Sequence, residues 1–260
     1  MRDLASYLAR IGYSGSTDPS AETLRALHRA HMFAVPFENL DIHLHRQIVC
    51  DEARFLDKIA NDHRGGFCYE LNGAFAALLR ALGFQATLLS ARVARPDGSE
   101  GREFDHLCLH VRANSDSEES WLADVGFGDS FVDPLRMQPG MEQAQFSRVF
   151  RLAEKDNDRL QMEERADGNW TPKYSFSLQP RSLSEFSGMC HYQQTSADSH
   201  FTQQRICSLA TEQGRITLAD LKFIETRDGK REERNLANDD EWRSILRNQF
   251  RIRLPEPDRT

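Results

Sequence analysis

The sequence lacks the segments that carry a chain into or across a membrane. Its N-terminus, MRDLASYLARIGYSG, is charged and amphipathic, without the apolar core and cleavage site of a secretory signal. No apolar stretch approaches the ~18 residues that a membrane-spanning helix needs. We therefore expect a cytoplasmic protein that has no membrane partner.

Positive charge is also scarce. The 33 lysines and arginines are outnumbered by 40 aspartates and glutamates, which gives a formal net charge of −7. Proteins that bind nucleic acid usually present a basic stripe, and no basic run of useful length occurs here. The composition argues against a nucleic-acid partner and is typical of a globular protein of one large domain or a few small ones.

Cysteine patterns that mark disulfide frameworks or zinc ribbons are missing. The chain has five cysteines, an odd number, and none of them forms a CxxC pair. Reduced thiols are therefore expected, and the useful question is whether one of them has a special environment. The five positions are Cys50, Cys68, Cys108, Cys190 and Cys207.

Hydrophobic periodicity divides the chain into a helical first part, a strand-rich middle and a mixed last part. The middle alternates as a curved antiparallel sheet or barrel does. The expected helices cover residues 4–11, 18–35, 51–60, 68–82 and 238–250. The expected strands cover residues 86–94, 104–111, 121–127, 146–152, 160–164, 173–178, 206–210, 216–218, 222–226 and 230–235.

Cys68 has the most distinctive context of the five thiols. It follows Gly65 and Gly66 and begins a strongly apolar helical pattern. A helix N-terminus carries partial positive charge, which lowers a thiol pKa, and its N–H groups can stabilise an oxyanion. A free cysteine is more often only a small buried residue. The glycine-preceded helix start nevertheless favours a nucleophile at Cys68.

A nucleophilic thiol needs a base, and the base needs a group that orients it. His106 lies in an alternating strand and points away from that strand's apolar face. Asp124 stands in an apolar run, where an unpaired carboxylate is costly. A surface or packed histidine and an edge-strand aspartate facing water remain the alternatives.

A metal site is a rival interpretation of the same strand. His106, Cys108 and His110 alternate onto one strand face, as metal ligands would. Their close spacing is unlike the usual zinc patterns, and the sequence supplies no obvious fourth ligand. We therefore predict that no metal is bound.

Five segments in order resemble the arylamine N-acetyltransferase family, in particular its bacterial, N-hydroxyarylamine O-acetyltransferase-like members. Residues 64–72 (RGGFCYELN) resemble the active-site signature, and residues 35–40 (VPFENL) resemble an upstream motif. Residues 106–111 and 124–128 (DVGFG) resemble two further motifs, and residues 199–209 a late one. The resemblance covers nearly the whole chain.

The resemblance implies an α+β fold in three parts, with a core like that of cysteine proteases and transglutaminases. Residues 1–84 would form an N-terminal helical bundle that carries the nucleophile. Residues 85–186 would form a central antiparallel β-barrel that carries the histidine and aspartate. Residues 187–260 would form a C-terminal α/β lid.

The resemblance also implies site residues. It makes Cys68, His106 and Asp124 a catalytic triad. One departure is Asp105, at a position where the family often has threonine near the coenzyme A thioester. The implied substrate pocket and cofactor contacts comprise Phe37, Val93, Phe127 and Phe201 for the substrate, and Gly126 and Gly128 for the cofactor.

The implied activity is ping-pong acetyl transfer of the kind used in xenobiotic metabolism, with acetyl-CoA as cosubstrate and no tightly bound cofactor. The acceptors would be small aromatic amines, hydroxyarylamines or hydrazines, acetylated on nitrogen or on the oxygen of the N-hydroxy form. The enzyme would be a monomer or homodimer. A transglutaminase-like or papain-like cysteine hydrolase or amide synthase with the same triad is the alternative enzyme, and a binding module without a reactive thiol is the alternative outside enzymes.

Overall fold

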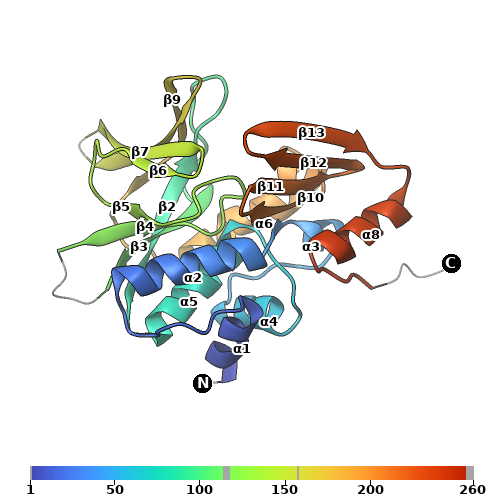
Figure 1. The fold of residues 1–260 in the computed structure, drawn as a ribbon, viewed down its shortest axis with the longest axis horizontal. Coiled ribbons are helices and arrows are strands. Elements are labelled where there is room, and N and C mark those ends of the chain that lie inside the picture. The colour runs from blue at the N-terminus through green and yellow to red at the C-terminus, as the bar shows by residue number, and fades with distance from the viewer. Residues whose placement is uncertain (1, 114–117, 157, 256–260) are drawn as a thin grey trace.

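A computed structural model of the protein describes residues 2–113, 118–156 and 158–255 (Figure 1). The helices are α1 Arg2–Arg10, α2 Ala21–Ala34, α3 Leu40–His43, α4 Glu52–Ala60, α5 Cys68–Ala81, the 3-10 turn η1 Leu183–Phe186, α6 Ser187–Thr195, α7 His200–Gln203 and α8 Asp239–Gln249. The strands are β1 Phe37–Glu38, β2 Gln85–Val93, β3 His106–Arg112, β4 Ser120–Ala123, β5 Leu135–Arg136, β6 Gln143–Gln145, β7 Arg148–Asp156, β8 Arg159–Ala166, β9 Asn169–Ser177, β10 Ile206–Thr211, β11 Gly214–Ala219, β12 Lys222–Arg227 and β13 Lys230–Asn235.

Helix α5 is the centre of the helical part. Its residues are apolar on nearly every side and almost all are buried, as expected for a helix surrounded by protein. It packs against α1 and α4 on one side and against β2 and β3 on the other. Because Cys68 is its first residue, the thiol lies where the helices meet the barrel sheet.

The middle of the chain forms an antiparallel eight-stranded sheet in the order β5-β4-β3-β2-β9-β8-β7-β6, curved into an almost closed barrel (Figure 1). Leu89 pairs with Cys108, and Leu109 pairs with Ala123, which fixes the register of β2, β3 and β4. The barrel encloses a core of its own, which includes Phe150.

A second, five-stranded antiparallel sheet ties the end of the chain to its beginning. Its order is β1-β10-β11-β12-β13, and Phe37 of β1 pairs with Ser208 of β10. Helix α8 covers one face of this sheet through a core that contains Trp242 and Leu246 (Figure 1). This sheet stands beside the barrel (Figure 1).

The structure confirms the α+β fold class, and most expected elements agree with it within a few residues. Two local expectations were wrong. Helix α2 begins after Ser20, whose side chain accepts the Thr23 N–H, and not at residue 18. The strand expected at residues 121–127 ends at Ala123, so Asp124 follows the strand. The division at residues 84/85 and 186/187 stays a prediction.

Among the described residues, no helix has both the length and the apolar character needed to span a bilayer. The longest two, α2 and α5, have 14 residues each.

Candidate active site

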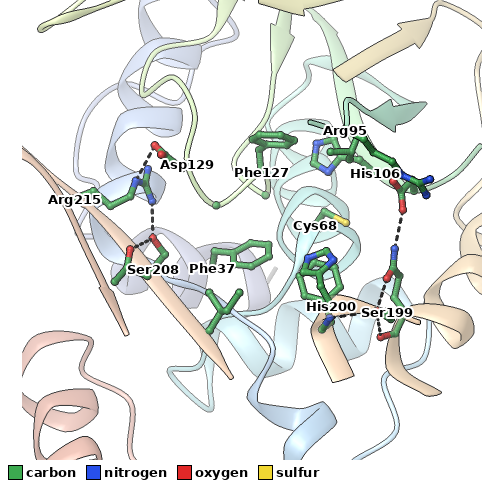
Figure 2. Close-up of a pocket in the computed structure, with 18 of the residues that line it drawn as sticks. Phe37, Cys68, Arg95, His106, Phe127, Asp129, Ser199, His200, Ser208 and Arg215 are labelled. Carbon is green, nitrogen blue, oxygen red and sulfur yellow. Dashed lines mark hydrogen bonds and ion pairs between the residues drawn. The ribbon is translucent and has the colours of Figure 1, made fainter. Parts of the chain in front are cut away.

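A cavity of about 790 Å³ lies between the barrel and the five-stranded sheet (Figure 2). Its wall combines phenylalanine rings with many polar and charged side chains, Arg95 and Arg215 among them. Eight of the nine site residues expected from the sequence line it; the ninth, Asp124, is fully buried behind His106. The eight are Phe37, Cys68, Val93, His106, Gly126, Phe127, Gly128 and Phe201.

The thiol of Cys68, the imidazole of His106 and the carboxylate of Asp124 form a continuous row. His106 Nε2 lies 2.7 Å from Asp124 Oδ2, and both side chains are almost inaccessible to solvent. The Cys68 thiol and the His106 side chain both line the cavity, and the influence of His106 works to lower the pKa of the thiol. Because Asp124 occupies Nε2, the remaining ring nitrogen, Nδ1, is the one available to the thiol.

Asp124 makes three hydrogen bonds besides the one with His106: its carboxylate accepts two, and its backbone N–H donates one. Its Oδ1 accepts hydrogen bonds from Asn72 Nδ2 at 2.9 Å and from the Gly126 N–H at 3.0 Å, and its own N–H donates to His28 Nε2 at 3.1 Å. These contacts explain why the chain leaves the sheet at Ala123. The carboxylate is turned inward and fully satisfied.

Asn72 was not identified as a separate site residue from the sequence. It lies one helical turn after Cys68 on α5, and its Nδ2 also donates to the Leu107 carbonyl at 2.6 Å. Its Oδ1 accepts the Val125 N–H at 2.9 Å. One amide thus joins α5, β3 and the segment after β4. The (i, i+4) spacing from Cys68 was the available signal.

Two glycines bring the segment after Asp124 against the helix. A Cβ on Gly126 would lie 2.8 Å from Cys68 Cα and 2.7 Å from Asn72 Nδ2, so a larger residue would push the segment away from α5. Gly128 has a φ of +88°, in the region that favours glycine, and packs near Phe37. Both glycines therefore have structural roles, whether or not they contact a cosubstrate.

The surroundings of His106 stabilise its protonated form. Burial alone lowers the pKa of His106, but the Asp124 carboxylate and the Cys68 thiol together raise it to about 10. For Asp124, burial works to raise the pKa, and the His106 charge with the hydrogen bonds from Asn72 and Gly126 lowers it below its usual range. The pair therefore favours carboxylate and imidazolium at neutral pH.

The thiol itself differs from the sequence-based expectation. Burial raises the pKa of the Cys68 thiol above its ordinary value, while the contact with His106 and the Leu107 N–H act in the opposite direction. The helix start and the histidine were visible in the sequence, but the complete burial of Cys68 was not. A thiolate at this position therefore depends on the imidazolium beside it.

A buried ion network supports the start of α5. Glu70 accepts the Phe67 N–H at 3.1 Å and closes the first turn, and its other oxygen lies 2.7 Å from Lys58 Nζ. Lys58 also pairs with Asp41, and Arg64 Nε donates to Glu38 at 2.9 Å. Three carboxylates thus face two cations, and burial raises the pKa of Glu70 to about 7.

This network predicts a pH-dependent stability. The pKa of Glu70 in the folded protein lies above its ordinary value of 4.5. The stability that comes from protonated Glu70 is therefore fully present below about pH 4.5 and is lost as the pH rises through about 7. Glu70→Gln should therefore gain stability relative to the parent between pH 5 and pH 8, by up to about 3 kcal/mol.

Urea unfolding at the two pH values measures this difference. Glu52→Gln is the matched control, because Glu52 is a half-exposed carboxylate on the neighbouring helix. The difference in unfolding free energy between Glu52→Gln and the parent should be the same at both pH values within about 0.5 kcal/mol. A difference for Glu70→Gln that is the same at both pH values would contradict the assigned pKa.

No group of three or more histidine, cysteine, aspartate or glutamate side chains is arranged to hold a metal ion within residues 2–113, 118–156 and 158–255. His106 instead faces the thiol and a carboxylate. A thiol beside an oriented imidazole can accept an acyl group from an activated donor and pass it to a second nucleophile.

Comparison with known proteins connects this site to a family. The sequence profile described as N-acetyltransferase matches residues 20–259. The arylamine N-acetyltransferase of Escherichia coli (strain K12) is 32% identical, over 95% of this chain and 88% of its own length. Arylamine N-acetyltransferase 1 of Homo sapiens is 30% identical, over 97% of this chain and 94% of its own length. Proansamycin X synthase of Amycolatopsis mediterranei is 29% identical, over 94% and 95%.

Solved structures agree with the sequence relatives. The Salmonella typhimurium arylamine N-acetyltransferase superposes with a TM-score of 0.91 at 30% identity, covering 100% of this chain and 94% of that one. The Mycobacterium marinum enzyme, whose structure is a complex with CoA, gives 0.89 at 30% identity, covering 96% and 92%. The chain belongs to the arylamine N-acetyltransferase family, and it is an acetyltransferase.

Proposed function

We propose that the enzyme moves an acetyl group from acetyl-CoA to an aromatic amine through a thioester on Cys68. The observation that carries this proposal is the row of thiol, imidazole and carboxylate at the wall of a 790 Å³ cavity. Two further findings support it. The chain is an arylamine N-acetyltransferase homologue, and a relative of the same fold has been solved with CoA.

In the first half-reaction, the Cys68 proton is held on His106 Nδ1 as part of the imidazolium, and the Cys68 thiolate attacks the carbonyl carbon of acetyl-CoA. The bond from that carbon to the CoA sulfur then breaks, and the leaving thiolate takes the proton from His106. Asp124 holds the imidazolium at Nε2 throughout. N–H groups at the start of α5 are available for the developing oxyanion, since the first turn of a helix leaves them without partners inside the helix.

In the second half-reaction, the acceptor nitrogen attacks the acetyl carbon on Cys68. His106 takes a proton from that nitrogen, the bond from carbon to Cys68 sulfur breaks, and the thiol is restored through His106. A hydroxylamine oxygen can replace the nitrogen, because the same base is in reach of either atom. A hydrazine would follow the same route.

The aromatic wall of the cavity is the proposed acceptor site. Phe37 and Phe127 border the cavity beside Cys68 (Figure 2), and Val93 and Phe201 complete the wall. The Phe127 ring also meets the His106 ring edge-on, with centroids 5.2 Å apart. Aromatic side chains favour such a flat, apolar substrate. Gly126 and Gly128 stay the proposed contacts of the cosubstrate, and residues 187–260 the proposed lid.

Initial-rate kinetics test the proposed function. With acetyl-CoA and an arylamine varied together, a ping-pong route predicts parallel lines in the double-reciprocal plot, and CoA should be released before any acceptor is added. Lines that intersect, with no CoA released in the absence of acceptor, would show direct transfer within a ternary complex.

Amide synthesis from another acyl donor is the second candidate function. One relative that matches almost the whole chain is named a synthase and not an acetyltransferase, which favours considering a product other than an acetylated amine. The row of thiol, imidazole and carboxylate suits both acetyl transfer and amide synthesis from another donor. Acetylation of Cys68 by acetyl-CoA, followed by discharge to an arylamine, separates them: an amide synthase of another donor would show neither step. Hydrolysis of the thioester in water at the same rate as transfer would instead favour a hydrolase.

Phe127 is expected to influence which amines are accepted. Phe127→Ala removes an aromatic contact worth about 1 kcal/mol, so kcat/KM for a flat aromatic amine should fall several-fold relative to a small hydrazine. CoA release in the absence of acceptor should change little. Phe146→Ala is the matched control, because Phe146 is an exposed ring outside this cavity. Unchanged acceptor preference in Phe127→Ala would remove Phe127 from the acceptor site.

A further inference from the structure

The residue before His106 belongs to a second set of hydrogen bonds that the proposed mechanism does not use. Gln193 of α6 donates from Nε2 to Asp105 Oδ1 at 2.8 Å. Ser199 Oγ donates toward Gln193 Oε1, 2.6 Å away, with the Gln193 carbonyl oxygen at 2.9 Å as a second acceptor, and the Phe201 N–H donates to Ser199 Oγ at 3.3 Å. All four residues line the cavity, where Figure 2 shows Ser199 on its wall.

The donor and acceptor groups of these residues fix the direction of each hydrogen bond in the set. An ionised Asp105 carboxylate only accepts hydrogen bonds, so the Gln193 NH₂ group must face it. Gln193 Oε1 is then left to accept from the Ser199 hydroxyl, whose lone pair accepts the Phe201 N–H. Gln193 and Ser199 are 5% and 3% exposed, so a reversed amide would bury two acceptors facing each other.

The Asp105 end of the chain is rigidly placed. Phe104 has a φ of +65°, a strained conformation for an aromatic residue. The Phe104 carbonyl accepts a hydrogen bond from the Tyr69 hydroxyl at 2.7 Å, and the Phe104 N–H donates to Ser90 Oγ at 2.8 Å. A Cβ on Gly101 would lie 2.0 Å from Asp105 Oδ2, so the loop packs tightly on the carboxylate. A strained backbone conformation persists only where the surrounding contacts hold it, and such positions are often found at functional sites.

The Phe201 end carries the wall of the acceptor site. The Phe201 ring contacts the Phe67 ring edge-on, with centroids 5.9 Å apart, and the Phe37 ring at 6.0 Å. Its carbonyl accepts from Asn39 Nδ2 at 2.9 Å. Helix α7 has only four residues, so its position depends on such contacts more than on its own length.

We propose that Asp105, Gln193 and Ser199 form a relay that sets the position of Phe201 relative to His106, and so determine acceptor selectivity. Asp105 is thus a positioning residue, one peptide bond from the base and three hydrogen bonds from the acceptor wall. The relay rests on the proposed function, since it needs an acceptor at Phe201. It acts through hydrogen-bond geometry, so charge at Asp105 is not required.

Four variants test the relay: Asp105→Ala, Asp105→Asn, Ser199→Ala, and the control Gln203→Ala, which removes an exposed hydrogen bond of α7. Each is assayed for CoA release without acceptor and for kcat/KM with a flat arylamine and with a small hydrazine. Asp105→Ala and Ser199→Ala should lower the arylamine-to-hydrazine ratio about ten-fold, with CoA release within about three-fold of the parent. Asp105→Asn should restore the ratio, because its amide oxygen accepts from Gln193.

Three results would overturn the relay. Equal losses with both acceptors and in CoA release would place Asp105 in the chemistry of the thiol. An Asp105→Asn variant as impaired as Asp105→Ala would show that charge is required. An unchanged ratio in the mild Ser199→Ala variant would show that Phe201 is positioned without the relay. Failure of the proposed function is distinct, since the parent would then release no CoA.

Discussion

Cys68→Ser is expected to fold normally and to lose acetyl transfer by about 10⁴-fold or more. A hydroxyl has a much higher pKa than a thiol, so His106 cannot generate the nucleophile, and removal of a nucleophile in comparable enzymes costs several decades of turnover. Because Cys68 is buried and the oxygen is smaller than sulfur, a modest loss of stability is also expected. Steady-state transfer from acetyl-CoA to an arylamine measures the effect, with the melting temperature as the check of folding.

The matched control for this variant is Cys50→Ser. Cys50 is a half-buried free thiol that packs against the same hydrophobic core but does not line the cavity. Its substitution should leave transfer within about two-fold of the parent. Transfer retained by a folded Cys68→Ser protein would exclude the cysteine route altogether.

Asp124→Asn is expected to lower transfer by about 10³- to 10⁴-fold, as loss of the orienting carboxylate does in another triad. The structure supplies the reason. Two donors, Asn72 Nδ2 and the Gly126 N–H, face Oδ1, so the new amide must turn its oxygen toward them. Its NH₂ group then faces His106 Nε2, which forces the imidazole proton onto Nδ1. In that tautomer Nδ1 cannot accept the Cys68 proton.

Asp133→Asn is the control for Asp124→Asn. Asp133 is a mostly buried carboxylate that pairs with the half-exposed Arg29 at 2.6 Å, away from the cavity. Its loss should cost at most about 1 kcal/mol of stability and leave transfer unchanged. A folded Asp124→Asn protein that transfers acetyl within ten-fold of the parent would show that Asp124 does not orient the base.

Local sequence patterns located the elements that carry the site. The two glycines before Cys68 and the apolar run after it placed the thiol at a helix start, and the alternation around His106 placed the histidine on a strand. Both features depend only on neighbours in the chain. Family motifs then supplied the pocket residues, and all of those residues line one cavity.

Features that depend on distant segments could not be predicted in the same way. The pKa of Cys68 depends on burial by several elements, which no local pattern reports. The pairing of Asp105 with Gln193 joins residues 88 positions apart, and the two share no sequence signal. The end of β4 at Ala123 follows from contacts of Asp124 with Asn72 and His28. Tertiary hydrogen bonds therefore overrode an apolar run that reads as continuous strand.

The most direct test of the account is intact-mass spectrometry of the protein after incubation with acetyl-CoA alone. The account predicts a gain of one acetyl group, located at Cys68 by peptide mapping, absent from Cys68→Ser, and removed when an arylamine is added. A protein whose mass is unchanged by acetyl-CoA and by other short acyl-CoA donors, while it still acetylates arylamines, would contradict the thioester on Cys68.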